Sequence, residues 1–280
     1  AAPADGSGDA GAEQRLPRIE GPKHVELGHQ ASIELPAGMM LFEQAPAQEI
    51  MKKLGNSPES VIALIVPSGE GQWMVVIAAH DVGYVDDSDA AELDAASMLE
   101  DFRKGTLEQN KERVKQGIPE MFVDGWSEPP RYQKAEHHLV WGLKGHDKDS
   151  QVVNFYTRLL TRNGYLSVNL IDDPAKIEAT KPSALAILSA IHLATGARYA
   201  DHQDGDHSSG MGLKALVVGG TAAVLIKKGG LVAILLGLKK FLVLGVAGIA
   251  AFFKRLFGGR KSTPAPVADA SSDPGEPPVG

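Results

Sequence analysis

The stretch Val152–Leu170, which reads VVNFYTRLLTRNGYLSVNL, carries the clearest structural signal in the chain. Asn163-Gly164 is a dipeptide typical of the tight turn of a β-hairpin. The apolar residues before this turn predict one long strand. After the turn, Leu166, Val168 and Leu170 alternate with other residues, as on a strand with one buried face. The sequence therefore predicts a long antiparallel hairpin.

Shorter strands and helices are predicted on both sides of this hairpin. Strands are predicted at His24–Leu27, Ser32–Leu35, Val61–Val66, Trp73–Ala79 and Glu136–Lys144. Helices are predicted at Pro46–Leu54, from an N-terminal cap at Asp89 to an interruption at Gly105, from Thr106 to Gly117, and from Asp173 to Gly196. The fold class that follows is α+β, with helices packed on a mainly antiparallel sheet in one domain over residues 21–210.

Charge is distributed unevenly along the 280 residues, whose formal net charge is −7. Residues 214–261 contain nine basic and no acidic side chains, so the rest of the chain is strongly acidic. An acidic balance argues against a nucleic-acid-binding protein, which carries a basic face. The basic stretch instead suits anionic lipid headgroups. Cysteine is absent, which excludes disulfides and thiolate chemistry.

The C-terminal quarter consists of apolar blocks separated by pairs of lysines. Its run Leu231–Phe253 is long enough to cross a hydrocarbon core of ~30 Å. Two lysines near the middle of this run cost about as much as the apolar residues contribute, so insertion of an isolated helix is marginal. A continuous helix would place most of the lysines on one side, as in an interfacial helix with snorkelling side chains. We therefore predict membrane-associated helix or helices over 211–261, with an anchor within 231–253.

Lipid contact and orientation follow from the positions of the cations. The residues predicted to contact the membrane are Lys214, Lys228, Lys239, Lys240, Lys254 and Arg255. Basic residues beyond the anchor predict a cytoplasmic C-terminus, which places the acidic domain in the periplasm and the protein in the bacterial inner membrane. The pairs Gly219-Gly220 and Gly229-Gly230 are typical of close helix contacts in membranes, so a homo-oligomer through this segment is a further expectation.

The two ends of the chain have the composition of flexible segments. Residues 1–14 are small, polar and acidic, as at a mature N-terminus left after removal of a signal peptide, which implies export. We expect a flexible lead over residues 1–20. Residues 262–280 are rich in Pro, Ser, Gly and Asp, which predicts a disordered tail.

An acidic cluster formed by Asp81, Asp86, Asp87 and Asp89 lies at the end of a predicted strand. Clustered carboxylates hold Ca²⁺ or Mg²⁺ through oxygen ligands, so these four residues are the candidate catalytic group of a metal-dependent enzyme. Their spacing does not match an EF-hand. The favoured interpretation is electrostatic, because acidic side chains at a helix N-terminus accept hydrogen bonds from free N–H groups and complement the helix dipole.

A second candidate group, for a metal site, consists of His202, Asp204, Asp206 and His207. Histidine and aspartate are common metal ligands. The surrounding Gly and Ser residues are typical of a flexible linker, whereas a metal site needs neighbouring groups that hold its ligands in place. No phosphate-binding loop accompanies the glycine pairs, so no cofactor is expected.

Two arginines and three aromatic residues of the strands allow two interpretations each. Arg158 and Arg162 lie on one strand face, where they could receive an anion. Cross-strand ion pairs on a solvated face are the favoured interpretation. The rings of Trp126, Tyr132 and Trp141 could stack on a ligand, but we expect them in the core.

Several sequence blocks resemble one bacterial family. They are Gly83–Ala90 (GYVDDSDA), Asn110 with Arg113, Gly125-Trp126 before Pro129–Tyr132, Val153–Phe155 with Arg158, Arg162 and Gly164, and Gly196–Asp201. The family comprises membrane-anchored proteins catalogued as domain of unknown function 2167, and the resemblance covers roughly residues 20–260. It implies an exported domain with a membrane anchor and assigns no activity. The chain departs from the family pattern at Met39-Met40 and in the His-rich stretch Asp201–His207.

Three functions remain open from the sequence. The leading hypothesis is a non-enzymatic, membrane-tethered periplasmic module that binds a protein or another envelope ligand. The second is a metal-dependent envelope hydrolase that uses the acidic cluster. The third is an oligomeric assembly that remodels or perforates the membrane through its lysine-lined helix.

Overall fold

The computed structural model describes residues 16–218, apart from Gly55, Ser57, Glu70, Gln116 and Ile118. The predicted tail, residues 1–15 of the predicted lead, and the predicted membrane segment beyond Val218 lie outside this part of the chain. Among the residues described, no helix is long and apolar enough to span a membrane.

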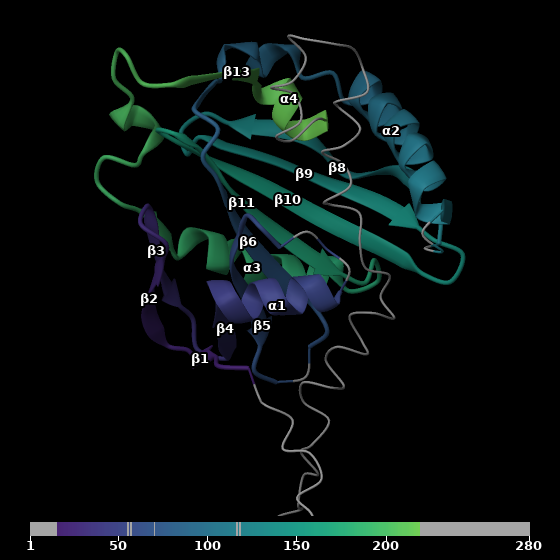
Figure 1. The fold of residues 1–280 in the computed structure, drawn as a ribbon, viewed down its shortest axis with the longest axis horizontal. Helices are drawn as coiled ribbons and strands as arrows, with labels where there is room; N and C mark the ends of the chain where they lie inside the picture. The colour runs from purple at the N-terminus through teal and green to yellow at the C-terminus, as the bar shows by residue number, and fades with distance from the viewer. Residues whose placement is uncertain are drawn as a thin grey trace, which may run out of the picture.

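An antiparallel sheet of eight strands forms the centre of the molecule (Figure 1). Its order is β1 (Ile19–Glu20), β4 (Met39–Glu43), β5 (Val61–Pro67), β6 (Met74–His80), β11 (Gly164–Asp172), β10 (Gln151–Thr161), β9 (His138–His146) and β8 (Phe122–Gln133). The predicted α+β class with a mainly antiparallel sheet is thereby confirmed.

Within the described part of the chain, two smaller sheets and four α-helices surround this sheet. The small sheets are β12 (Ile191–Leu193), β3 (Ala31–Leu35) and β2 (Lys23–Leu27), and the parallel pair β13 (Ser208–Gly212) and β7 (Tyr84–Asp86). The helices are α1 (Gln44–Lys53), α2 (Ala95–Lys115), α3 (Ile177–Ser189) and α4 (Leu213–Val218), with 3₁₀ turns η1 (Ser88–Glu92) and η2 (Tyr199–Asp201).

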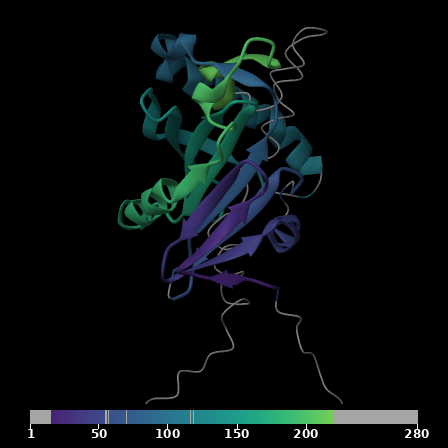
Figure 2. The same ribbon diagram turned by 90° about the vertical axis from the view of Figure 1, so that its left-hand side faces the viewer.

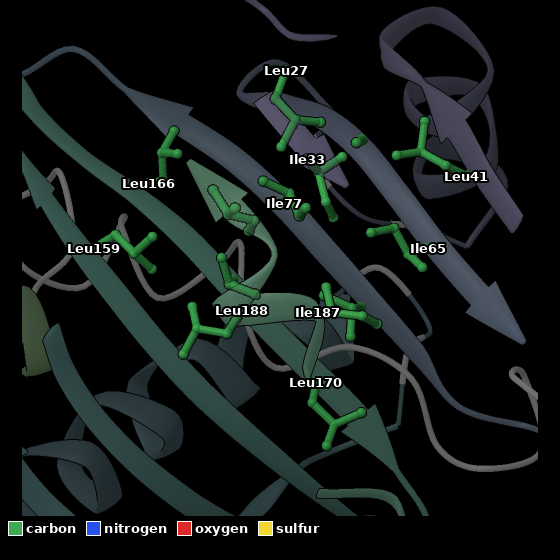
Figure 3. Close-up of a cluster of buried hydrophobic side chains, with 14 of the residues drawn as sticks. Leu27, Ile33, Leu41, Ile65, Ile77, Leu159, Leu166, Leu170, Ile187 and Leu188 are labelled. Atoms are coloured by element: carbon green, nitrogen blue, oxygen red, sulfur yellow. The ribbon is translucent and has the colours of Figure 1, made fainter. Parts of the chain in front are cut away.

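Both faces of the large sheet are covered, with α1 and α3 on opposite sides (Figure 2). One face packs against the sheet β12-β3-β2 and α3, where Ile33, Ile77 and Leu188 belong to one apolar cluster (Figure 3). The other face carries a cluster under α1 and another under α2 and α4. Strands β10 and β11 are consequently buried on both faces, although the sequence predicts a single buried face for the second of them.

The predicted hairpin is present, but its turn lies one residue earlier than expected. Thr161 pairs with Gly164, so Arg162 and Asn163 form the loop. Gly164 belongs to the strand because β6 approaches it closely: a Cβ there would collide with the carbonyl oxygen of His80. Glycine is therefore needed at position 164 because β6 approaches β11 closely there, and not because position 164 lies in the turn.

Three predicted helix boundaries are wrong. Helix α2 begins at Ala95 and is capped by Asp94, whose Oδ1 accepts the amide of Ala96 at 3.0 Å. It continues through the buried Gly105, because this side of the helix packs on β8. Helix α3 ends at Ser189 rather than at Gly196, because the chain beyond it pairs with β3 as a strand.

The buried carboxyl of Asp172 predicts a pH dependence of stability. Asp172 is 1% exposed, and burial raises the pKa of its carboxyl. The folded state therefore binds this proton more tightly, so its stabilisation is complete below the unfolded pKa of about 4 and is lost as pH rises through the folded pKa. We expect Asp172→Asn to raise the free energy of unfolding by about 1 kcal/mol at neutral pH.

Urea unfolding of the two proteins across pH 3–8 tests this expectation. Asp204→Asn is the control, because the same change is made on an exposed side chain. A gain for Asp172→Asn that is equally large at pH 3 would contradict it.

Candidate functional site

Strand β7, within the block Gly83–Ala90, pairs with strand β13, which lies more than 120 residues later in the sequence. It pairs in parallel with β13, so that Tyr84 lies beside Ser208. The Tyr84 amide donates to the carbonyl oxygen of His207 at 2.7 Å, and the Gly83 amide donates to that of Asn163 at 2.8 Å. A Cβ on Gly83, whose φ is +93°, would collide with the backbone at His207 and Ser209. Glycine is therefore required where the hairpin turn, β7 and β13 meet.

Six side chains from three regions of the chain meet near this point, and we call them the motif cluster. They are Tyr84 of β7, Asp87 after it, Tyr132 of β8, His137 of the β8–β9 turn, Tyr199 of η2, and His202. Four of the six belong to blocks that resemble the family, so sequence signals far apart in the chain mark one place in the fold.

A carboxylate, a phenol and an imidazole form the first half of the motif cluster. The Tyr132 hydroxyl donates to Oδ2 of Asp87 at 2.7 Å, and the same hydroxyl oxygen lies 3.0 Å from Nδ1 of His137. Burial, and then the charge and hydrogen bond of Asp87, raise the pKa of Tyr132, which keeps the phenol protonated. The side chains of Asp87 and His137 are 23% and 30% exposed, so solvent reaches this half.

Stacked rings form the second half. Tyr84 lies between Tyr199, at 4.6 Å between centroids, and His202, at 3.8 Å. His137 lies 4.4 Å from Tyr199 and so joins the two halves. The Tyr199 hydroxyl donates to the carbonyl oxygen of Val85 at 2.8 Å, and burial raises the pKa of this phenol. The rings therefore form one continuous layer over η2 and β7.

One candidate ligand of the predicted metal site, Asp206, is already bound by an arginine. Arg162 donates from Nε and Nη2 to the two carboxylate oxygens of Asp206, at 2.7 and 2.8 Å, and this pairing lowers the pKa of Asp206. His202 lies 3.2 Å from the same carboxylate, whereas Asp204 is exposed and His207 lies beside Gly83. The structure thus brings together two of the four candidates. Within the described chain, no three His, Asp or Glu side chains are arranged to hold a metal ion.

The four aspartates of the acidic cluster have separate surroundings. Asp81 is exposed after β6, and Asp86 accepts the amide of Ser88 at 2.8 Å. Asp87 belongs to the motif cluster. Asp89 accepts the amides of Leu213 and Lys214 at 2.8 and 3.1 Å, which are the first residues of α4. Asp89 therefore caps a helix, as predicted. The helix is α4, however, and not the helix that follows Asp89 in the sequence.

This cap predicts a local effect. We expect Asp89→Ala to lower the free energy of unfolding by about 1–2 kcal/mol, because two amide N–H groups at the start of α4 lose their acceptor. Hydrogen exchange at residues 213–218 should accelerate more than exchange in the central sheet. Asp86→Ala is the matched control, since the amide that Asp86 accepts, that of Ser88, lies within its own turn. Equal exchange at these amides in both variants would contradict the cap.

Arg158 is buried, which corrects the expectation of a solvated strand face. It is 3% exposed, and its guanidinium lies 4.8 Å from the ring centroid of Trp141. The face is covered by α2 and α4, so the arginine packs among aromatic rings. Arg162 lies in the loop after β10, and it pairs with the distant Asp206 instead of an acidic residue across the strands. Trp141 lies in the core as expected, and Trp126 donates to the carbonyl oxygen of Ala95 at 2.9 Å.

Two members of the motif cluster, Tyr84 and Tyr199, were not singled out individually from the sequence. Tyr84 and Tyr199 lie in the blocks Gly83–Ala90 and Gly196–Asp201, which was the available signal. His137 was expected within a strand, but it lies in the turn before β9 with a φ of +53°. No sequence pattern indicates that conformation.

A comparison with solved structures found matches with low TM-scores and little shared sequence. The solution structure of cyanobacterial PsbP from Synechocystis sp. PCC 6803 has a TM-score of 0.37 and 13% identity, and covers 69% of this chain and 98% of its own. A mutant of the protein Mog1 has a TM-score of 0.31 and 14% identity, and covers 61% of this chain and 95% of its own.

Comparison at the level of sequence gives one assignment. No curated protein matches the chain. The model of the family described as "Protein of unknown function (DUF2167)" matches residues 19–250, and the chain belongs to this family.

Proposed function

We propose that this protein is a membrane-tethered module of the bacterial envelope that binds a protein or another envelope ligand through the motif cluster. One observation carries the proposal. Three distant regions of the chain converge on a part-exposed layer of rings and polar groups, and four of its six side chains lie in blocks typical of the family. Exposed polar and aromatic side chains that a fold brings together from separate elements are typical of a recognition site.

Binding is favoured over metal-dependent hydrolysis by the bonding of the acidic side chains. Asp87 accepts from Tyr132, Asp89 accepts from the start of α4, and Asp206 is bound by Arg162. These carboxylates bond in three different places and do not surround a common point. The observations favour a prearranged recognition surface.

The tether rests on the sequence beyond the described residues. The apolar run Leu231–Phe253 would anchor the protein in the inner membrane, and the flanking cations would contact anionic lipid headgroups. In this proposal the domain faces the periplasm and the tail lies in the cytoplasm. Association of copies through the glycine pairs would bring several modules together.

Fractionation of bacterial cells tests the tether. The full chain is compared with a chain that ends after Val218, both exported by the same signal peptide. We expect the full chain to sediment with membranes and to resist an alkaline wash, and the shortened chain to appear in the periplasmic extract. Recovery of the full chain in the soluble fraction without detergent would contradict the proposal.

Site-specific photo-crosslinking in living cells tests the binding surface. A photoreactive residue replaces Asp204, which is exposed next to the motif cluster, or Leu185, which is 43% exposed on α3. We expect a discrete crosslinked species from position 204 that is absent from position 185 and disappears with Tyr84→Leu. No species from position 204, or the same species from both positions, would contradict binding at the motif cluster.

A further inference from the structure

The hydrogen bonds of Tyr132 determine which nitrogen of His137 carries a proton. The Tyr132 hydroxyl has one hydrogen but lies within hydrogen-bonding distance of both Asp87 and His137. A carboxylate only accepts, so the phenolic hydrogen points to Asp87. The contact with His137 is then a hydrogen bond only if Nδ1 of His137 donates to the hydroxyl oxygen. The network therefore holds the imidazole in its Nδ1–H form.

This proton arrangement leaves the other ring nitrogen available. In a neutral imidazole with a proton on Nδ1, Nε2 carries the lone pair and is a hydrogen-bond acceptor. The bond to Tyr132 and the contact with Tyr199 fix the orientation of the ring. Since the side chain is 30% exposed, an incoming molecule can reach the ring.

The backbone at His137 gives a second, independent indication of function. With a φ of +53°, His137 is the one residue other than glycine with a positive φ in the described part of the chain. Glycine or asparagine adopts this conformation at lower cost. Strained residues of this kind are concentrated at functional sites. The turn needs no imidazole to form, so the side chain itself accounts best for a histidine here.

The charges around the ring indicate the kind of ligand. Asp87 lies 3.9 Å from Nδ1 of His137, and Glu136 precedes it in the turn. The pKa of the neighbouring His138 is lowered mainly by burial, which favours its neutral form. The phenols of Tyr132 and Tyr199 stay protonated because their pKa values are raised. The carboxylate of Asp87 beside the ring disfavours a phosphate or carboxylate and favours a hydroxyl or amide group.

We propose that Nε2 of His137 accepts a hydrogen bond from an O–H or N–H group of the ligand, with Tyr132 and Asp87 as the positioning residues that hold the ring. This inference rests on the proposed function for the existence of a ligand. The state of the imidazole does not depend on a ligand and can be measured alone.

Nuclear magnetic resonance of the full chain with ¹⁵N-labelled histidine tests the positioning. His137→Asn assigns the signals of this ring, since asparagine tolerates the left-handed backbone. In the neutral ring, we expect Nδ1 to show the shift of a protonated nitrogen and Nε2 that of a lone-pair nitrogen. Tyr132→Phe, which removes only the hydroxyl, should convert His137 to the Nε2–H form. An Nε2–H ring in the unaltered chain, or no change in Tyr132→Phe, would overturn the positioning.

Photo-crosslinking from position 204 tests the contact with the ligand. We expect His137→Asn to reduce the yield of the specific species by up to about tenfold, as for the loss of one hydrogen bond. His192→Asn is the control, because this exposed histidine lies on β12. An unchanged yield in His137→Asn would overturn the contact. If the unaltered chain gives no specific species, the proposed function fails and the ligand contact with it, whereas the result for the ring nitrogens stands.

Discussion

Replacing Arg158 by alanine is expected to lower the free energy of unfolding by about 3–5 kcal/mol. The guanidinium lies over Trp141 and close to Tyr156 and Tyr165, with centroid distances of 4.8, 5.6 and 5.7 Å. Its Nη1 also donates to Oδ1 of Asn169 at 2.9 Å. Alanine would leave a cavity between these rings and a buried amide oxygen without this donor, and both effects are destabilising.

Urea unfolding followed by tryptophan fluorescence and circular dichroism measures this loss. Arg158→Met is the matched variant, because it fills most of the same volume without the charge, and it should lose about half as much. Arg131→Ala is the surface control. Arg131 is exposed and pairs with Glu128, so its loss should cost less than about 1 kcal/mol. Similar losses for Arg158→Ala and Arg131→Ala would contradict the packing role of Arg158.

The burial of Arg158 could not be predicted from its strand. Alternation along β10 places Arg158 on the same face as Tyr156, and an arginine on such a strand usually faces solvent. Whether the face is covered depends on α2 and α4, which are distant in the sequence. Local patterns predicted the pairing of β10 with β11, because neighbouring segments joined by a short turn determine it. The coverage of the sheet is decided by topology.

The same distinction explains the candidate site. The sequence singled out Asp87, Asp89, His202 and Asp206 from their chemistry, and each has a specific partner in the structure. The partners could not be predicted, because the Asp89 amide bonds span 124 and 125 residues and the Arg162–Asp206 pair spans 44. The parallel pairing of β7 with β13 creates these contacts, and no local pattern indicates it. Candidate residues were therefore easier to predict than their arrangement.

The order of the helices shows how tertiary packing overrides a local signal. Asp89 with Glu92 has the spacing of a helix start, and Gly105 has the propensity of a helix interruption. The structure instead begins α2 at Ala95 and continues it through Gly105. Packing of α2 on β8 stabilises the helix by more than the ~1 kcal/mol that a glycine costs.

Gly164→Ala is expected to lower the free energy of unfolding by about 3 kcal/mol, which is large for the addition of one methyl group. Gly164 has a φ of +149°, and its Cα faces the carbonyl oxygen of His80 on the neighbouring strand β6. An added Cβ would have to displace a backbone atom, which cannot rotate away as a side chain does. The displaced strand carries His80, whose ring stacks on Tyr165 at 4.5 Å.

Gly28→Ala is the control that separates the effect of the collision with β6 from the effect of an unfavourable backbone conformation. Gly28 has a φ of +67° in the turn before β3. Among the described residues other than its chain neighbours, none has an atom within 4 Å of the position that its Cβ would take. Its replacement should cost about 1–2 kcal/mol, which is the price of a left-handed conformation alone. The difference between the two variants in the free energy of unfolding, measured with urea, gives the cost of the collision between the added Cβ and β6. Equal losses of stability would show that β6 moves aside for the added methyl group. Glycine at position 164 would then be needed for the turn alone, as the sequence pattern predicts.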